Sequence, residues 1–285
     1  MQPGRPSLTA LSAAHLRAAH QVLDGACILA DPLAARILGP DARFSLDYAR
    51  LSALVSRAEL SGPLLRWFIA ARSRIAEDAL HTAISNGATQ LVVLGAGFDT
   101  LPYRMPRLSN IRIFEVDHPA TQARKRERLA MAAIEVPETL SYVAMDLEEQ
   151  TLAAPLQSAG FEAAERSFFS CLGVVPYLTE QAIFAIFDYA AQLRGGAEVV
   201  FDYVCSTGSL RPTTCAPPRA IAEAPATGQQ IRSYLETADL CSKLSMTGFR
   251  TVENMGPEQI AARLFPDAGR GGSLSGCHIM RAATG

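Results

Sequence analysis

The sequence lacks several features that would place it in a well-marked class of protein. None of its apolar runs approaches the roughly eighteen residues that a membrane-spanning helix needs, and its first residues hold no continuous apolar segment typical of a secretory leader. Lysine and arginine are scattered and the formal net charge is -2, so no basic field is present to recruit nucleic acid. We therefore expect neither a membrane nor a nucleic-acid partner, and nothing in the sequence indicates an oligomeric state.

Metal-binding and disulfide patterns are also missing. The six cysteines lie far apart, with no CxxC pair and no cluster of cysteine and histidine at zinc spacing, so we expect no metal site. We interpret them as reduced thiols in a cytoplasmic protein. A P-loop is excluded because neither GxxxxGKS nor GxxxxGKT occurs.

What is present is enough apolar sequence for one large core, followed along the chain by a change in pattern. Of the 285 residues 49% are hydrophobic and 19% are charged. The first third is rich in alanine and leucine, which predicts helices over 7–38 and 47–86, with a break at 61–63. Asp31-Pro32 is a helix start and Asn86-Gly87 a helix end. We expect residues 1–86 to form an N-terminal helical cap and residues 87–285 to form the core.

In the core, short β-branched runs alternate with helical patterns. This alternation predicts an open, mostly parallel α/β sheet with helices on both faces. Strands are expected near 90–95, 111–117, 140–145, 167–172 and 198–204, and two more near 249–255 and 274–282. Helices are expected near 119–132, 151–159 and 179–193, and a loop and helix insertion is expected over 206–245, with its helix near 229–243.

A glycine-containing loop, Gly95-Ala96-Gly97-Phe98-Asp99-Thr100, follows the first of these strands directly. Glycine there lets the backbone turn sharply and lets a ligand approach the main chain. Asp117 ends the next strand 22 residues after Gly95, the separation expected of a carboxylate that accepts hydrogen bonds from ribose hydroxyls. The pair predicts a nucleoside-containing ligand, with a glycine-rich turn that binds nothing as the alternative.

A nicotinamide-dependent oxidoreductase would use the same geometry. It is disfavoured because Thr100 replaces the third glycine of GxGxxG, which permits close packing of helix against strand.

Five segments, taken in order and spacing, resemble the leucine carboxyl methyltransferase family, and more closely its bacterial branch of S-adenosylmethionine (SAM)-dependent class I methyltransferases. The segments are Ala71-Arg72-Ser73-Arg74, Leu94-Gly95-Ala96-Gly97-Phe98-Asp99-Thr100, Glu115-Val116-Asp117-His118-Pro119, Val143-Ala144-Met145-Asp146-Leu147 and Gly173-Val174-Val175-Pro176-Tyr177-Leu178. The resemblance covers roughly residues 7–205 and implies a Rossmann-like, seven-stranded methyltransferase sheet with SAM as cofactor.

The resemblance also implies roles for individual residues. Arg72 would hold the methionine carboxylate of SAM, because a planar guanidinium can meet a carboxylate with two donors. Asp117 would accept the ribose hydroxyls, and Asp146 with the backbone of Leu147 would bind adenine. The predicted cofactor-binding set is Arg72, Gly95, Ala96, Gly97, Asp99, Asp117, His118, Asp146, Leu147 and Leu172.

Each role has a plainer alternative. Arg72 would otherwise be a solvated or salt-bridged arginine on its helix, where Arg74 and Asp78 have i,i+4 spacing. Asp146 would otherwise be an ordinary acid at a strand end. Asp99 is expected to brace the loop through backbone N–H groups rather than touch substrate.

One position departs from the family's pattern. Leu172 stands where the family's phosphatase methyltransferases, and many bacterial members, have a glutamate before the glycine. A protein C-terminal carboxylate therefore does not carry over as the substrate. A catalytically degenerate SAM-binding scaffold protein stays open as an alternative.

Methyl transfer is an in-line displacement, so the enzyme mainly aligns the reacting atoms and excludes water. A carboxylate acceptor is already a nucleophile, whereas an alcohol or phenol needs a base. No residue is assigned as that base. The main candidates are Tyr177, Tyr203 and His118, and the lesser ones are His15, His20 and Asp202, each with packing or a local structural role as the alternative. We predict O-methylation of a small molecule or an exposed carboxylate, with the N-terminal helices as a lid.

Overall fold

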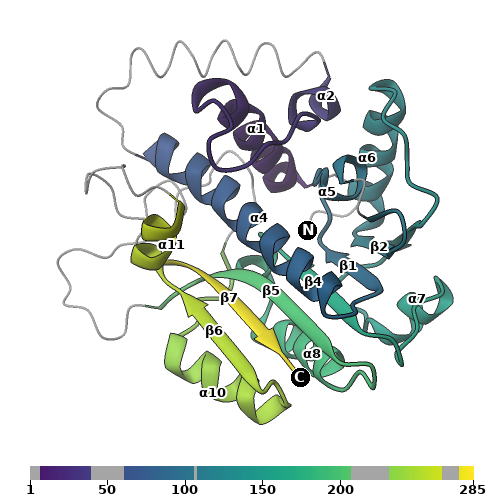
Figure 1. Cartoon of the computed structure of the whole chain (residues 1–285), viewed down its shortest axis with the longest axis vertical. Coiled ribbons are helices and arrows are strands. Elements are labelled where there is room, and N and C mark those ends of the chain that lie inside the picture. The colour runs from purple at the N-terminus through teal and green to yellow at the C-terminus, as the bar shows by residue number, and fades with distance from the viewer. Residues whose placement is uncertain (1–6, 40–60, 106–107, 207–230, 265–275) are drawn as a thin grey trace.

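A computed structural model describes residues 7–39, 61–105, 108–206, 231–264 and 276–285 of the chain. The described elements form one sheet with helices on both faces (Figure 1). The strands are β1 (Gln90–Leu94), β2 (Arg112–Asp117), β3 (Leu140–Ala144), β4 (Ser167–Cys171), β5 (Ala197–Val204), β6 (Thr251–Met255) and β7 (Cys277–Ala283).

Except at the predicted break of 61–63, which is helical, and near 229–243, the described helices lie close to the predicted bounds. They are α1 (Leu8–Leu23), α2 (Ala34–Leu38), α4 (Ser61–Ser85), α5 (Leu101–Arg104), α6 (Pro119–Met131), α7 (Ala153–Ser158), the 3-10 helix η2 (Val175–Tyr177), α8 (Glu180–Ala191), α10 (Thr237–Thr247) and α11 (Pro257–Leu264). Residues 47–60 of the second predicted helical stretch lie outside the described residues, as does most of the predicted loop of 206–245. The short helices α5 and α11 were not predicted. No helix within the described ranges has both the length and the apolar character needed to cross a membrane.

The strand order is β3-β2-β1-β4-β5-β7-β6. The pairs from β3 to β5 are parallel, and β7 runs antiparallel to both β5 and β6. This confirms the predicted seven-stranded, mostly parallel sheet. The chain moves outward to β2 and β3 on one side of β1 and to β4 and β5 on the other, so the topological switch point lies between β1 and β4.

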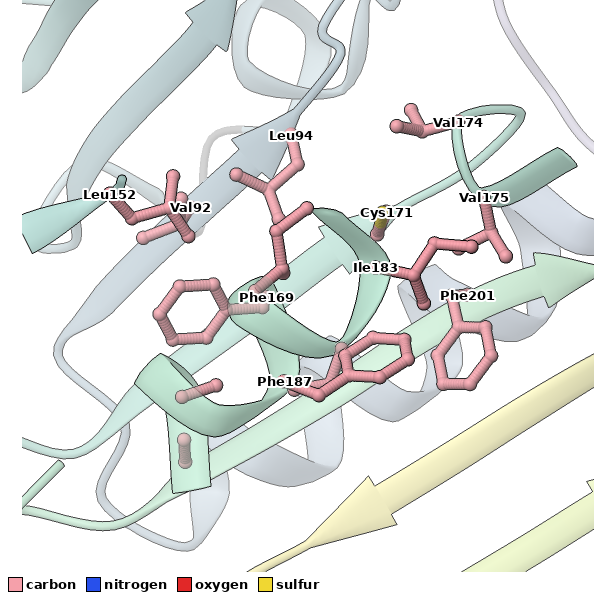
Figure 2. Close-up of a cluster of buried hydrophobic side chains, with 14 of the residues drawn as sticks. Val92, Leu94, Leu152, Phe169, Cys171, Val174, Val175, Ile183, Phe187 and Phe201 are labelled. Carbon is pink, nitrogen blue, oxygen red and sulfur yellow. The ribbon is translucent and has the colours of Figure 1, made fainter. Parts of the chain in front are cut away.

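The central strands are buried on both faces because they are apolar on successive residues. Val92 and Leu94 of β1 belong to the core on the face of α8, where Phe187 packs on Phe201 with ring centroids 4.6 Å apart (Figure 2). Leu91 and Val93 belong to the core on the opposite face, beneath the long helix α4 (Figure 1).

The N-terminal helices pack against the loop that follows β1. A third apolar cluster joins Ala14 of α1, Ile37 of α2 and Leu129 of α6 to Phe98 of that loop. α2 begins at Ala34, two residues later than the predicted start at Pro32. The carboxylate of Asp31 accepts the Leu33 N–H at 3.2 Å and so holds a turn before the helix.

The helix predicted near 229–243 begins later and ends later than expected. α10 starts at Thr237 because Glu236 is its N-cap and accepts the Asp239 N–H at 2.8 Å. The segment just before it is not helical: Arg232 N–H donates to the Pro176 carbonyl, and Leu235 bridges to Cys205. These ties hold residues 231–235 across the carboxyl ends of the strands.

Candidate active site

The loops after β1 and β4 meet at the switch point. Gly95 and Gly97 have φ values of +59° and +46°, which confirms the predicted sharp turn. A Cβ on Gly95 would overlap Val174 Cγ2, and one on Gly97 would lie 3.0 Å from the Cβ of Ala10 in α1. Protein atoms therefore fill the space beside both Cα atoms, where the sequence led us to expect a ligand.

Asp117, at the end of β2, fixes this loop. Its buried carboxylate accepts the Gly97 N–H at 2.5 Å and the His118 N–H at 2.7 Å. Burial raises the pKa of Asp117, and the two N–H donors oppose that rise. Each carboxylate oxygen keeps further lone-pair capacity, so hydroxyls of a ligand can still donate to it.

A buried ion pair lies under the same loop. Lys125 Nζ of α6 is 2.6 Å from Glu115 Oε1, and both side chains are only 1% exposed. Tyr103 donates to the second oxygen of Glu115 at 2.9 Å, and Lys125 Nζ lies 3.5 Å from the Ala96 carbonyl. Sequence reasoning missed this pair. The sequence showed only that Glu115 and Asp117, two residues apart on one strand, lie on the same face of the sheet.

Asp99 bonds the backbone at the end of the loop. Its Oδ1 accepts the Leu101 N–H at 3.0 Å. Burial opposes ionisation of Asp99, but the charges of Arg17, Lys125 and Arg104 outweigh it and lower its pKa. Arg17 of α1 also donates to the Phe98 carbonyl at 2.6 Å, so α1 is tied directly to the loop.

Arg72 of α4 lies at the ends of β4 and β5. Its Nη1 donates to Asp202 Oδ2 at 2.8 Å, and its guanidinium passes over Gly173, where a Cβ would come within 2.8 Å of Nη2. Gly173 has φ +70° and donates its N–H to Asp202 Oδ1 at 2.5 Å. The i,i+4 salt bridge on this helix is made by Arg74 and Asp78 at 2.8 Å, on its exposed side.

The loop after β3 lies beside that after β2, because the Met145 N–H donates to the Asp117 carbonyl at 2.9 Å. Asp146 accepts the Glu148 N–H at 3.0 Å, and Leu147 packs against the core on the α8 face. Glu148 in turn accepts the backbone N–H of Thr179 at 2.6 Å. Leu172, after β4, packs against the core beneath α4.

The histidine candidates are engaged locally. His118 is the N-cap of α6, and its Nδ1 accepts the Ala120 N–H at 3.2 Å. His15 Nδ1 bonds the Leu11 carbonyl at 2.9 Å. His20 is fully buried, and its Nε2 accepts the N–H groups of residues 28 and 29, so its proton lies on Nδ1, which faces Asp24 at 2.8 Å.

The two tyrosine candidates lie in different places. Tyr203 belongs to the core on the α8 face, and its hydroxyl bonds Thr237 at 2.8 Å and Asn254 at 3.0 Å. Tyr177 lies in η2, where the charges of Arg72 and Asp202 both act on it. Only Tyr177 of this pair lies beside the loops described above.

These loops all follow parallel strands at one edge of a doubly wound sheet, the arrangement of a class I methyltransferase. The leucine carboxyl methyltransferase family model matches residues 10–191, and the chain belongs to that family. It is a SAM-dependent methyltransferase, and its cofactor is SAM.

Individual relatives agree with this assignment. The chain is 30% identical to the Bacillus subtilis (strain 168) protein YktD, described as a "Putative S-adenosyl-L-methionine-dependent methyltransferase", over 93% of each chain. It is 34% identical to a protein of the same description from Mycolicibacterium gilvum (strain PYR-GCK), over 48% of this chain and 44% of that protein. The crystal structure of a "putative methyltransferase" from Thermobifida fusca YX shares the fold, with TM-score 0.55, 13% identity and coverage of 99% and 96% of the two chains.

The residues at this edge fit SAM chemically. In the described part of the chain, Arg72 has one hydrogen bond, from Nη1, so its remaining N–H groups can meet a carboxylate. Gly173 keeps the guanidinium close to the strand ends, since any side chain there would displace it. Asp117 supplies acceptors for hydroxyls. These individual roles stay predictions, and the nicotinamide alternative gives way to the family assignment.

Proposed function

We propose that this methyltransferase forms a methyl ester on the carboxylate of a small-molecule acceptor. The observation that supports this choice is that most of the candidate bases are already engaged. Within the described residues, His20 Nε2 and His118 Nδ1 accept backbone N–H groups, and the Tyr203 hydroxyl bonds two side chains on the α8 face of the sheet. A carboxylate acceptor needs none of them, because it is ionised at neutral pH.

Tyr177 supports the same choice. Burial raises the pKa of its hydroxyl, Arg72 opposes that rise and Asp202 adds to it. A raised pKa keeps the phenol protonated at neutral pH, so Tyr177 donates a hydrogen bond rather than accepts a proton. A protonated tyrosine can orient an acceptor carboxylate but cannot activate an alcohol.

SAM supplies an electrophilic methyl group on a sulfonium, and the protein's task is to align and shield it. Arg72 holds the methionine end, and Asp117 holds the ribose. Of residues 1–86, helices α1 and α2 act as a lid over the core of residues 87–285, whereas α4 covers one face of the sheet. The contacts that support the lid are Arg17 on the Phe98 carbonyl and Ala10 against Gly97.

The proposal includes a cytoplasmic setting. The five cysteines within the described residues carry free thiols, and Cys171 and Cys277 among them are buried. Free thiols persist best in a reducing compartment. Fluorescence of a tagged chain in fractionated cells tests this setting.

Methyl esters can be told from ethers and amines by their chemistry. The purified protein is incubated with SAM tritiated on its methyl group and with matched panels of carboxylic acids, alcohols, phenols and amines. Mild alkali hydrolyses a methyl ester and releases volatile methanol, whereas methyl ethers and methylamines keep the label. We expect label transfer to acids, with release by alkali.

Label that is transferred but survives alkali would refute the carboxylate proposal. Heat-denatured protein is the control for non-enzymatic transfer. Tight SAM binding with no transfer to any panel would favour the scaffold alternative instead.

A further inference from the structure

We propose that Asp202 is a positioning residue, which sets the Arg72 guanidinium and the Gly173 backbone for the carboxylate of the cofactor. Asp202 lies on β5, Arg72 on α4 and Gly173 after β4, so one carboxylate joins three elements. The inference rests on the proposed assignment of Arg72 to the cofactor carboxylate.

Both oxygens of Asp202 are used, each for a different partner. Oδ2 accepts from Arg72 Nη1 at 2.8 Å, and Oδ1 accepts the Gly173 N–H at 2.5 Å. The side chains of Asp202 and Arg72 are 5% and 12% exposed. Hydrogen bonds between charged groups at this depth are short and directional, so the pair fixes a geometry rather than only balancing charge.

The orientation of the guanidinium matters because its donors are planar. Arginine has high rotamer freedom, and a ligand that must order it pays that cost on binding. Asp202 orders the side chain beforehand by holding Nη1. The other N–H groups of Arg72 are then directed along a fixed plane beside Gly173, where Nη2 lies 2.8 Å from the Cβ that any other residue would carry.

The same contacts explain why Asp202 is not used as a base. Each of its oxygens already accepts a hydrogen bond, and its charge is matched by the arginine that it holds. A proton transferred to Asp202 would remove the negative charge that holds Arg72 Nη1, and breaking such a pair is costly.

The test compares two ligands that differ at the methionine end. S-adenosylhomocysteine carries the amino acid group, whereas 5′-deoxy-5′-methylthioadenosine keeps the adenosine and thioether but lacks it. In Asp202→Asn, an amide oxygen can still serve Gly173, but an NH2 group faces Arg72. We expect S-adenosylhomocysteine to bind about tenfold more weakly and methylthioadenosine to change by less than about twofold, both by calorimetry.

A matched control lies on the same strand and face. Glu198 of β5 is a buried carboxylate paired with Arg281 at 2.6 Å and 3.1 Å, four residues from Asp202 and at the other end of the strand. Glu198→Gln removes a comparable ion pair away from the site. We expect it to leave the affinity for both ligands unchanged.

Arg72→Ala distinguishes a failure of the Arg72 assignment from a failure of the positioning role of Asp202. If Arg72→Ala weakens both ligands equally or neither, the assignment of Arg72 is wrong and the role of Asp202 falls with it. If Arg72→Ala acts only on S-adenosylhomocysteine but Asp202→Asn acts on both ligands equally or on neither, Arg72 stands and the positioning role is overturned.

Circular dichroism checks that each variant is folded before binding is measured. If Asp202→Asn does not fold, Asp202→Glu keeps the buried charge and displaces the guanidinium by about 1.5 Å. The same selective loss for S-adenosylhomocysteine is expected from it, and equal losses for the two ligands would refute the proposal.

Discussion

Replacement of Lys125 by methionine tests whether the ion pair under the loop that follows β1 is buried. Lys125 Nζ and Glu115 Oε1 are 2.6 Å apart, and Tyr103 donates to the other carboxylate oxygen. Methionine fills most of the lysine volume and carries no charge. The variant therefore leaves Glu115 as a buried acid without its cationic partner, and it opens no large cavity.

The expected loss in the free energy of unfolding is set by the unpaired charge of Glu115. At 2.6 Å the attraction of the pair is roughly 6 kcal/mol at an effective dielectric constant of about 20, and the desolvation of both ions offsets much of it. Removal of one partner leaves the desolvation cost of the other in place. We expect Lys125→Met to lower the free energy of unfolding by about 3–5 kcal/mol at pH 7.

The loss should depend on pH in one direction. Burial raises the pKa of Glu115, and Lys125 opposes that rise, so the variant raises this pKa further. Between the unfolded and folded pKa values the folded state binds more protons, and stability falls as pH rises, with a limiting slope of about 1.4 kcal/mol per pH unit. The deficit of the variant should therefore be larger at pH 8 than at pH 5. Asp99 and Asp117, whose pKa values Lys125 also lowers, act in the same direction.

Urea denaturation, followed by the fluorescence of the single tryptophan, measures the loss at each pH. Arg124→Met on the same helix is the control, because Arg124 and Glu127 form a pair whose side chains are 40% and 54% exposed. Such a pair contributes about 0–1 kcal/mol. A Lys125→Met loss no larger than that of the control, or one that does not grow with pH, would refute the buried-pair reasoning.

Two further substitutions probe the loop and the sheet. Gly95→Ala should cost roughly 2–4 kcal/mol of stability and abolish SAM binding, because it combines a positive φ with overlap on Val174. The control is Gly87→Ala, at φ +91° with no atom within 4 Å of the new Cβ, which should cost about 1 kcal/mol. Equal losses of the two variants in urea denaturation would contradict the overlap at Gly95. Tyr203→Phe should cost about 1–2 kcal/mol and leave kcat within about twofold, since its hydroxyl only bonds Thr237 and Asn254. A tenfold fall in kcat would restore Tyr203 as a candidate base.

The sheet could be predicted because its signals are local. Each central strand is a short run of apolar residues in sequence, and burial on both faces follows from that composition alone. The end of α4 was equally local, since Gly87 supplies the positive φ that ends a helix. The carboxyl edge of a parallel sheet then gathers Gly95 and Asp117 without any further information.

The partners of the charged side chains could not be predicted, because they come from distant segments. Asp202 follows Arg72 by 130 positions in the sequence, and only the packing of α4 across β5 brings them together. Without that packing, Asp202 was a candidate base, and the ion pair that the sequence indicated on the helix of Arg72 was that of Arg74 with Asp78. The start of α10 was missed for a related reason: contacts of residues 231–235 with η2 and β5 override a helical local pattern.

The glycines of the site could be recognised in the sequence, but the groups that lie against them could not. A glycine indicates that something approaches the main chain, but the sequence does not say what. At Gly95, Gly97 and Gly173 the approaching groups are a valine side chain, helix α1 and the Arg72 guanidinium. Because these glycines have no Cβ, the two loops, helix α1 and the arginine can pack closely together. If SAM binds here as predicted, it meets a surface that this packing has already formed. The cost of a substitution at these glycines should accordingly appear first in the stability of the free protein, and only then in its affinity for the cofactor.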